Sequence, residues 1–123
     1  MLYLLPRYML YEYWLLQDSS APMPWWHLAA AEKQTLRLTA AGDCVAIHFD
    51  ARARKTDFAR IRAALADNPR VAFARRRVKC GWGEWSLVAA TLEALKAAVA
   101  EFPGATHFYM LSGDCMPIKT AEY

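Results

Sequence analysis

The sequence of 123 residues is 56% hydrophobic and carries a formal net charge of +3. A chain of this length buries roughly two-thirds of the surface that it exposes when unfolded, which suits one domain and argues against two. Its three cysteines, Cys44, Cys80 and Cys115, lack the paired spacing of a zinc site or a disulfide framework, so we interpret them as free thiols in a reducing compartment.

The first segment, residues 1–35, is rich in aromatic residues, and its pattern predicts no definite structure for most of its length. Residues 1–16 are too short and too charged to span a bilayer, and they lack the cleavage site of a signal peptide. A linker at residues 18–24 precedes a helix expected from about Leu28 to Ala40 and ended by Gly42. We interpret the aromatic residues as core or partner-surface groups, because the polar face lacks the lysines and arginines of a membrane anchor.

Two predicted strands follow, with a helix between them. Residues 45–50 form an apolar, β-rich run that stops at Asp50, which places this carboxylate at the carboxyl end of a strand. Thr56 is expected to cap a helix that continues to Leu65. The second strand, residues 71–74, leads into a basic loop that contains glycines, residues 75–83.

A second helix and a third strand complete the predicted order. Ser86 is expected to cap the helix, and Pro103-Gly104 ends it. The third strand, residues 106–111, leads into a polar loop at residues 112–117. Alternating strands and helices with short links predict right-handed crossovers and a parallel sheet, whose carboxyl ends bind ligands in open α/β folds. The helix is indicated by apolar residues spaced along one face, namely Val88, Leu92, Leu95, Val99 and Phe102.

Positive charge gathers in the middle of the chain, which favours an anionic ligand there. The run Arg75–Lys79 lacks the interleaved aromatic residues and the recognised motif of a nucleic-acid-binding surface, so we predict no nucleic-acid partner. Two interpretations of the run stay open: a solvated loop, or a contact with an anionic group.

Three runs together resemble the core-2/I-branching N-acetylglucosaminyltransferases and the related peptide O-xylosyltransferases. They are residues 45–50, residues 82–92 and residues 111–120, and the resemblance extends from about Leu36 to Tyr123. It implies an α/β fold with the Rossmann-like parallel sheet of a GT-A type glycosyltransferase, here a partial domain. Residues 36–123 would form the amino-terminal half of a nucleotide-sugar-binding domain, whereas the family's opening strand is not recognisable in residues 1–34.

The resemblance also assigns candidate donor-binding residues. By matching position, Asp50 would receive the uridine or ribose, because a carboxylate accepts hydrogen bonds from sugar hydroxyls or a base imide; the alternative is that it only turns the chain. Trp82 or Trp85 would stack on a base or sugar, although core packing explains a tryptophan equally well. One arginine of the basic run would face the donor diphosphate. The donor-binding candidates are His48, Asp50, Arg77, Trp82, Ser86, Asp114 and Lys119.

The third run departs from the family pattern. Asp114 lies one residue away from the position of the family's acid, and Lys119 is either a phosphate ligand or a surface charge. The resemblance places the catalytic base and the main diphosphate-binding cations in a part of the family beyond Tyr123, so Glu84 is not the expected base and the catalytic residues stay unknown. No Asp-x-Asp pair is present to hold a divalent cation, so we expect no metal and no cofactor besides the UDP-sugar substrate.

The expected function is therefore inverting transfer of N-acetylglucosamine or xylose from a UDP-sugar to a hydroxyl of a glycan or protein acceptor, with this chain a fragment that carries the donor-binding half. The alternative is a non-catalytic nucleotide- or anion-binding module, or an inactive truncated product. Without a spanning segment or paired cysteines, we expect a cytoplasmic protein or one that contacts the inner membrane face peripherally.

Overall fold

The computed structural model describes residues 8–13, 25–81 and 83–112, which form one α/β unit of strands and helices. The strands are β1 (Tyr8–Tyr13), β2 (Cys44–Phe49), β3 (Val71–Phe73) and β4 (Tyr109–Ser112). The helices are α1 (Trp25–Ala40), α2 (Lys55–Ala64) and α3 (Trp85–Glu101). Within these residues, no helix has both the length and the apolar character needed to cross a bilayer.

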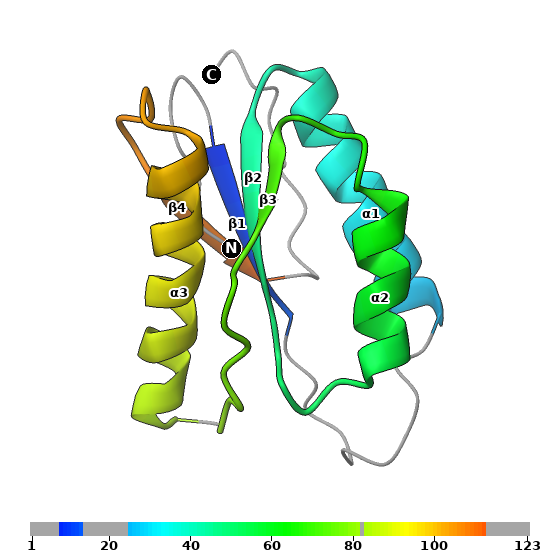
Figure 1. Ribbon diagram of the computed structural model, residues 1–123, viewed down its shortest axis with the longest axis vertical. Coiled ribbons are helices and arrows are strands. Elements are labelled where there is room, and N and C mark those ends of the chain that lie inside the picture. The colour runs from blue at the N-terminus through cyan, green and yellow to red at the C-terminus, as the bar shows by residue number, and fades with distance from the viewer. Residues whose placement is uncertain (1–7, 14–24, 82, 113–123) are drawn as a thin grey trace.

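The strands form one parallel sheet in the order β3-β2-β1-β4. Figure 1 shows α1 and α2 on one face of the sheet and α3 on the other, so the unit has three layers. The chain steps outward from β1 to β2 and β3, and α3 then carries it back across the sheet to β4 on the far side of β1. This reversal creates a switch point between β1 and β4, where open α/β sheets bind ligands outside the carboxyl ends of their strands.

The structure places a strand within residues 1–35, the segment for which the sequence pattern predicted no definite structure. The strand β1 lies there and pairs with β2 on one side and β4 on the other, with Tyr8 opposite Cys44 and Met9 opposite Tyr109. The predicted boundary between residues 35 and 36 falls inside α1. The strand β1 is therefore an inner strand of the sheet, and α1 joins residues on both sides of the predicted boundary.

The end of α1 follows the prediction made from Gly42. This glycine has a φ of 99°, in the left-handed region that favours glycine. The amide of Gly42 donates to the Thr39 carbonyl at 3.1 Å, and the amide of Asp43 donates to the Leu38 carbonyl at 3.0 Å. These two bonds form a Schellman motif, which satisfies carbonyls that the helix leaves without partners.

The predicted N-caps of the other two helices are wrong. Arg54 precedes α2 and Glu84 precedes α3, and neither side chain caps its helix. Thr56 and Ser86 each occupy the second position of the helix instead. Ser86 uses its hydroxyl outside the helix, where it accepts a hydrogen bond from the amide of Gly81 at 2.8 Å.

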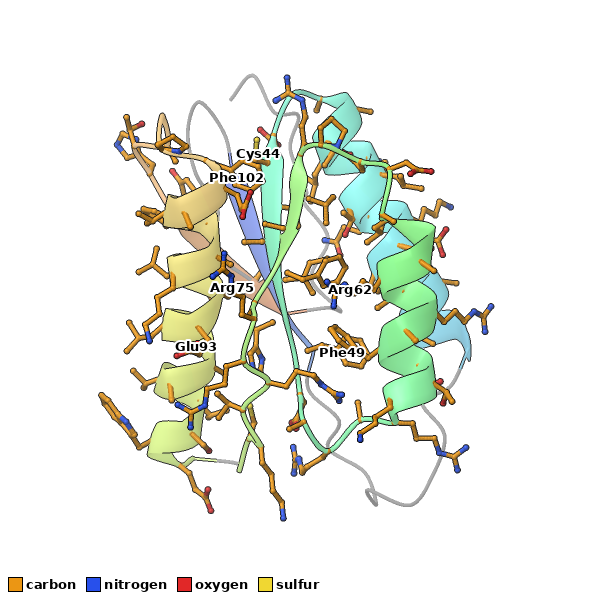
Figure 2. The ribbon with its side chains drawn as sticks, in the orientation of Figure 1. Cys44, Phe49, Arg62, Arg75, Glu93 and Phe102 are labelled. Carbon is orange, nitrogen blue, oxygen red and sulfur yellow. The ribbon has the colours of Figure 1, made fainter. Side chains whose placement is uncertain are left out.

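The central strand β2 is buried over all six of its residues, and its side chains alternate between two cores. Val45, Ile47 and Phe49 belong to a core with α1 and α2, whereas Cys44 and Ala46 belong to a core with α3. Figure 2 shows Phe49 on the side that α2 covers and Phe102 beside Cys44 on the α3 side. Burial of β2 on both faces explains its continuous apolar run.

Helix α3 packs on the sheet mainly through small residues, whereas most of the apolar stripe that indicated the helix is exposed. Ala90, Ala94 and Ala98 are buried, whereas Val88, Leu92 and Val99 are 43%, 43% and 54% exposed. Alanines four residues apart form a low ridge on one side of a helix, so α3 approaches the similarly small side chains of the sheet closely. Of the stripe, Phe102 is buried just beyond the end of the helix, and Leu95 is partly buried against the same core.

We expect Ala94→Leu to lower the free energy of unfolding by about 2 kcal/mol, because added methylenes at a fully buried site force the neighbouring groups apart. Urea denaturation measures this loss. Ala100→Leu makes the same change at an exposed position of α3 and is the matched control. Equal stabilities of the two variants would contradict the packing of α3 described above.

Candidate functional site

The predicted site residues that the structure describes gather where β2 and β3 end. His48 lies on β2, Asp50 directly follows β2, Arg77 lies in the loop after β3, and Ser86 lies in the first turn of α3. The sequence therefore predicted correctly that these segments meet at the carboxyl end of the sheet. Three further candidates lie outside the described residues: Trp82, Asp114 and Lys119.

Asp50 is fully buried, and its carboxylate is held by partners within the chain. Its Oδ1 accepts hydrogen bonds from the backbone amides of Arg52 at 2.8 Å and Cys80 at 3.4 Å. Its Oδ2 accepts from the Arg52 guanidinium, at 2.9 Å from Nη2 and 3.1 Å from Nε. These contacts match the chain-turning alternative, and the donor-binding role of Asp50 stays a prediction.

His48 is also buried, with 1% of its surface exposed. The amide of Val78 donates to its Nε2 at 2.9 Å, which assigns the ring proton to Nδ1 and makes the imidazole neutral. Burial lowers the pKa of His48 from 6.5 to about 4, opposed by the charge of Asp50 and reinforced by that of Arg77. The neutral ring therefore acts as a hydrogen-bond acceptor for the loop after β3.

Arg77 points inward and holds the connection between β2 and α2. Its Nη2 donates to the carbonyls of Asp50 at 2.6 Å and Ala53 at 2.7 Å, and its Nε donates to the carbonyl of Phe49 at 3.3 Å. The guanidinium carbon also lies 4.8 Å from the ring centroid of Phe58. Burial lowers the pKa of Arg77. Carbonyls of the chain itself thus take the Nη2 and Nε donors of Arg77, and its donor-binding role stays a prediction.

We call residues 77–80 the tethered loop, because bonds to the end of β2 fix it on both sides. The amides of Val78 and Cys80 donate to the side chains of His48 and Asp50, and the amide of Ala51 donates to the Val78 carbonyl at 2.9 Å. Two alternate residues of the chain, His48 and Asp50, thus accept hydrogen bonds from two alternate amides of the loop. These side-chain contacts therefore extend the association of β2 with the segment after β3 beyond the backbone hydrogen bonds between β2 and β3.

Ser86 connects the end of this loop to α3. Its hydroxyl accepts a hydrogen bond from the Gly81 amide and donates to Glu84 Oε2 at 3.3 Å. Gly83 has a φ of 69°, so the tight turn before the helix uses the left-handed conformation that glycine allows. Trp85 is 72% exposed, which rules out the core-packing interpretation for this tryptophan. It leaves a flat apolar surface at the carboxyl end of the sheet.

Sequence reasoning missed the partners of Asp50. An aspartate whose carboxylate accepts the amide two residues later forms an Asx-turn, so the segment from Asp50 to Arg52 carried a usable signal. The contact with Cys80 joins segments thirty residues apart, and no local pattern indicates it. Among the described residues, no three histidine, cysteine or acidic side chains lie together as metal ligands.

Comparison with known proteins gives one match. The family model described as Core-2/I-Branching enzyme matches residues 31–123. The parallel sheet with helices on both of its faces defines a domain of the α/β class. The chain belongs to the Core-2/I-Branching enzyme family, which implies glycosyltransferase activity in general, with a sugar donor and an acceptor. No curated protein and no solved structure matches it.

Proposed function

We propose that this chain binds the donor of an inverting glycosyltransferase with the GT-A type of fold. The donor is a UDP-sugar, and N-acetylglucosamine or xylose passes to a hydroxyl of a glycan or protein acceptor. The family match carries this proposal. The sheet order supports it, because the reversal between β1 and β4 is the arrangement at which open α/β folds bind nucleotides.

Transfer of the sugar requires two kinds of group from the protein. A base removes the proton of the acceptor hydroxyl, and cationic groups stabilise the negative charge that develops on the leaving UDP. We assign no described residue as the base. The described residues serve the donor side: Trp85 offers a face on which a uracil or sugar ring stacks, and exposed cations of the loop after β3 attract the diphosphate.

We expect calorimetric titration of the chain in EDTA to show binding of UDP, with UDP-N-acetylglucosamine or UDP-xylose binding more tightly than UDP alone. Trp85→Ala removes an exposed ring without disturbing the core, and we expect it to weaken UDP binding about tenfold. Leu36→Ala, an exposed apolar residue of α1, is the matched control and should bind as the unchanged chain does.

Titration with ADP distinguishes this proposal from the alternative, a non-catalytic anion-binding module. Equal affinity for ADP and UDP would favour a non-catalytic anion-binding module, because a uridine-specific donor site discriminates between the bases. Absence of UDP binding by a folded chain, verified by circular dichroism, would contradict the proposed function.

A further inference from the structure

The four cations of the basic run, residues 75–79, have different surroundings in the structure. Arg77 is turned inward onto backbone carbonyls. Arg75 lines a hollow at the outer edge of β3 together with Arg62 and Glu101, away from the carboxyl end of β2 (Figure 2). Arg76 is exposed. The hydrogen bond from Lys96 lowers the pKa of the Glu93 carboxyl on α3, and the charge of Arg76 adds to this effect. Lys79 is the remaining cation.

Lys79 combines an exposed side chain with a backbone that is fixed on both sides. The residue before it, Val78, bonds through its amide to His48 and through its carbonyl to the Ala51 amide. The residue after it, Cys80, is buried and bonds through its amide to Asp50. Within the described residues, Lys79 itself makes no ion pair or side-chain hydrogen bond.

An exposed lysine whose backbone is held in this way is well placed to bind an anionic ligand. Because the backbone is already ordered, the only conformational ordering that the loop contributes to the cost of binding is that of one side chain. An ammonium group acts on phosphate as a point charge with three donors, so it needs no bidentate geometry. Lys79 lies at the carboxyl end of the sheet, in the loop that Ser86 connects to α3.

We propose that Lys79 of the tethered loop binds the diphosphate of the donor nucleotide, the contact that the resemblance gave to an arginine of the basic run. This inference rests on the proposed function and names a contact within it. In this proposal the buried His48 and Asp50 and the partly buried Arg77 act on the ligand only indirectly, because they hold the loop that carries Lys79.

The test compares Lys79→Gln with Lys33→Gln, which removes one exposed positive charge from the middle of α1. Calorimetry with UDP, uridine and inorganic pyrophosphate separates the diphosphate from the nucleoside. We expect Lys79→Gln to weaken UDP and pyrophosphate binding about tenfold and to leave uridine binding unchanged, whereas Lys33→Gln changes none of them. Lys79→Arg should restore most of the affinity, and the effect should shrink in high salt.

Two results would overturn the inference while the proposed function stands: UDP binding unchanged by Lys79→Gln, or UDP and uridine binding weakened equally. If the unchanged chain binds pyrophosphate through Lys79 but does not bind UDP, the proposed function fails and the anion contact remains. Binding of neither ligand by the folded chain overturns both. Thermal unfolding of each variant confirms that loss of affinity does not reflect loss of fold.

Discussion

Asp50→Ala is expected to lower the free energy of unfolding by about 3 kcal/mol, because it removes the acceptor for several donors at a buried position. The amides of Arg52 and Cys80 lose their partner, and the Arg52 guanidinium loses its counter-ion at 2.9 Å. The Arg52 side chain is 24% exposed, so water can solvate part of the guanidinium once its counter-ion is gone. The expected decrease in the free energy of unfolding is therefore at the lower end of the range for a broken buried ion pair.

Urea denaturation followed by circular dichroism measures this effect. Asp67→Ala makes the same chemical change at an exposed turn position and should cost less than about 0.5 kcal/mol. If both variants were equally stable, the account of Asp50 as the buried centre of the loop contacts would be wrong. A loss of UDP binding in Asp50→Ala would not identify a ligand contact, because the substitution also releases the loop that carries Lys79.

The free energy of unfolding is expected to fall as the pH drops from about 6.5 to about 4, because His48 takes up a proton in this range in the unfolded chain but not in the folded protein. The folded protein holds the pKa of His48 at about 4, whereas the unfolded chain has the ordinary value of 6.5. Between these values the unfolded chain binds more protons, so stability is fully present above 6.5 and is lost on acidification. The difference corresponds to roughly 3 kcal/mol at most.

The variant His48→Gln isolates this contribution. A glutamine places a neutral acceptor near the position of Nε2, so it can still receive the amide of Val78 but does not titrate. Urea midpoints measured at intervals from pH 7 to pH 4 should decline for the unchanged protein and stay nearly level for His48→Gln until the carboxylates titrate. The pKa of Glu93 is also lowered, so its contribution is lost at the acid end in both proteins. Parallel declines in the two proteins would contradict a neutral, buried His48.

The sequence predicted the parts of the fold that depend on local chemistry. The apolar run of β2 and the glycine that ends α1 both identify structure through short-range patterns. The strand β1 was missed because its aromatic sequence contains a glutamate, and because its partners β2 and β4 lie far along the chain. The orientation of α3 was also hidden, since alanines carry little hydrophobic signal although they make its contact with the sheet.

The sequence predicted where the candidate site lies, but it did not predict what each residue of the site does. Strand ends identified His48, Asp50 and the basic loop as neighbours, and the structure brings them together. The sequence did not show which cation of Arg75–Lys79 turns inward, because that depends on the carbonyls of the β2–α2 connection and on the ring of Phe58. These groups lie before β3 in the chain, whereas the loop follows β3, so only the tertiary structure distinguishes Arg77 from Lys79.

The measurement that tests the central claim most directly is the amide nuclear magnetic resonance spectrum of the chain titrated with UDP in EDTA. The account predicts that the amide signals of Lys79, Gly81 and Ser86 shift in proportion to bound UDP. Those of Asp43 and Arg70, beside the amino-terminal ends of β2 and β3, should stay in place. Absence of shifts at saturating UDP, or shifts confined to that opposite end of the sheet, would contradict a donor site at the carboxyl end.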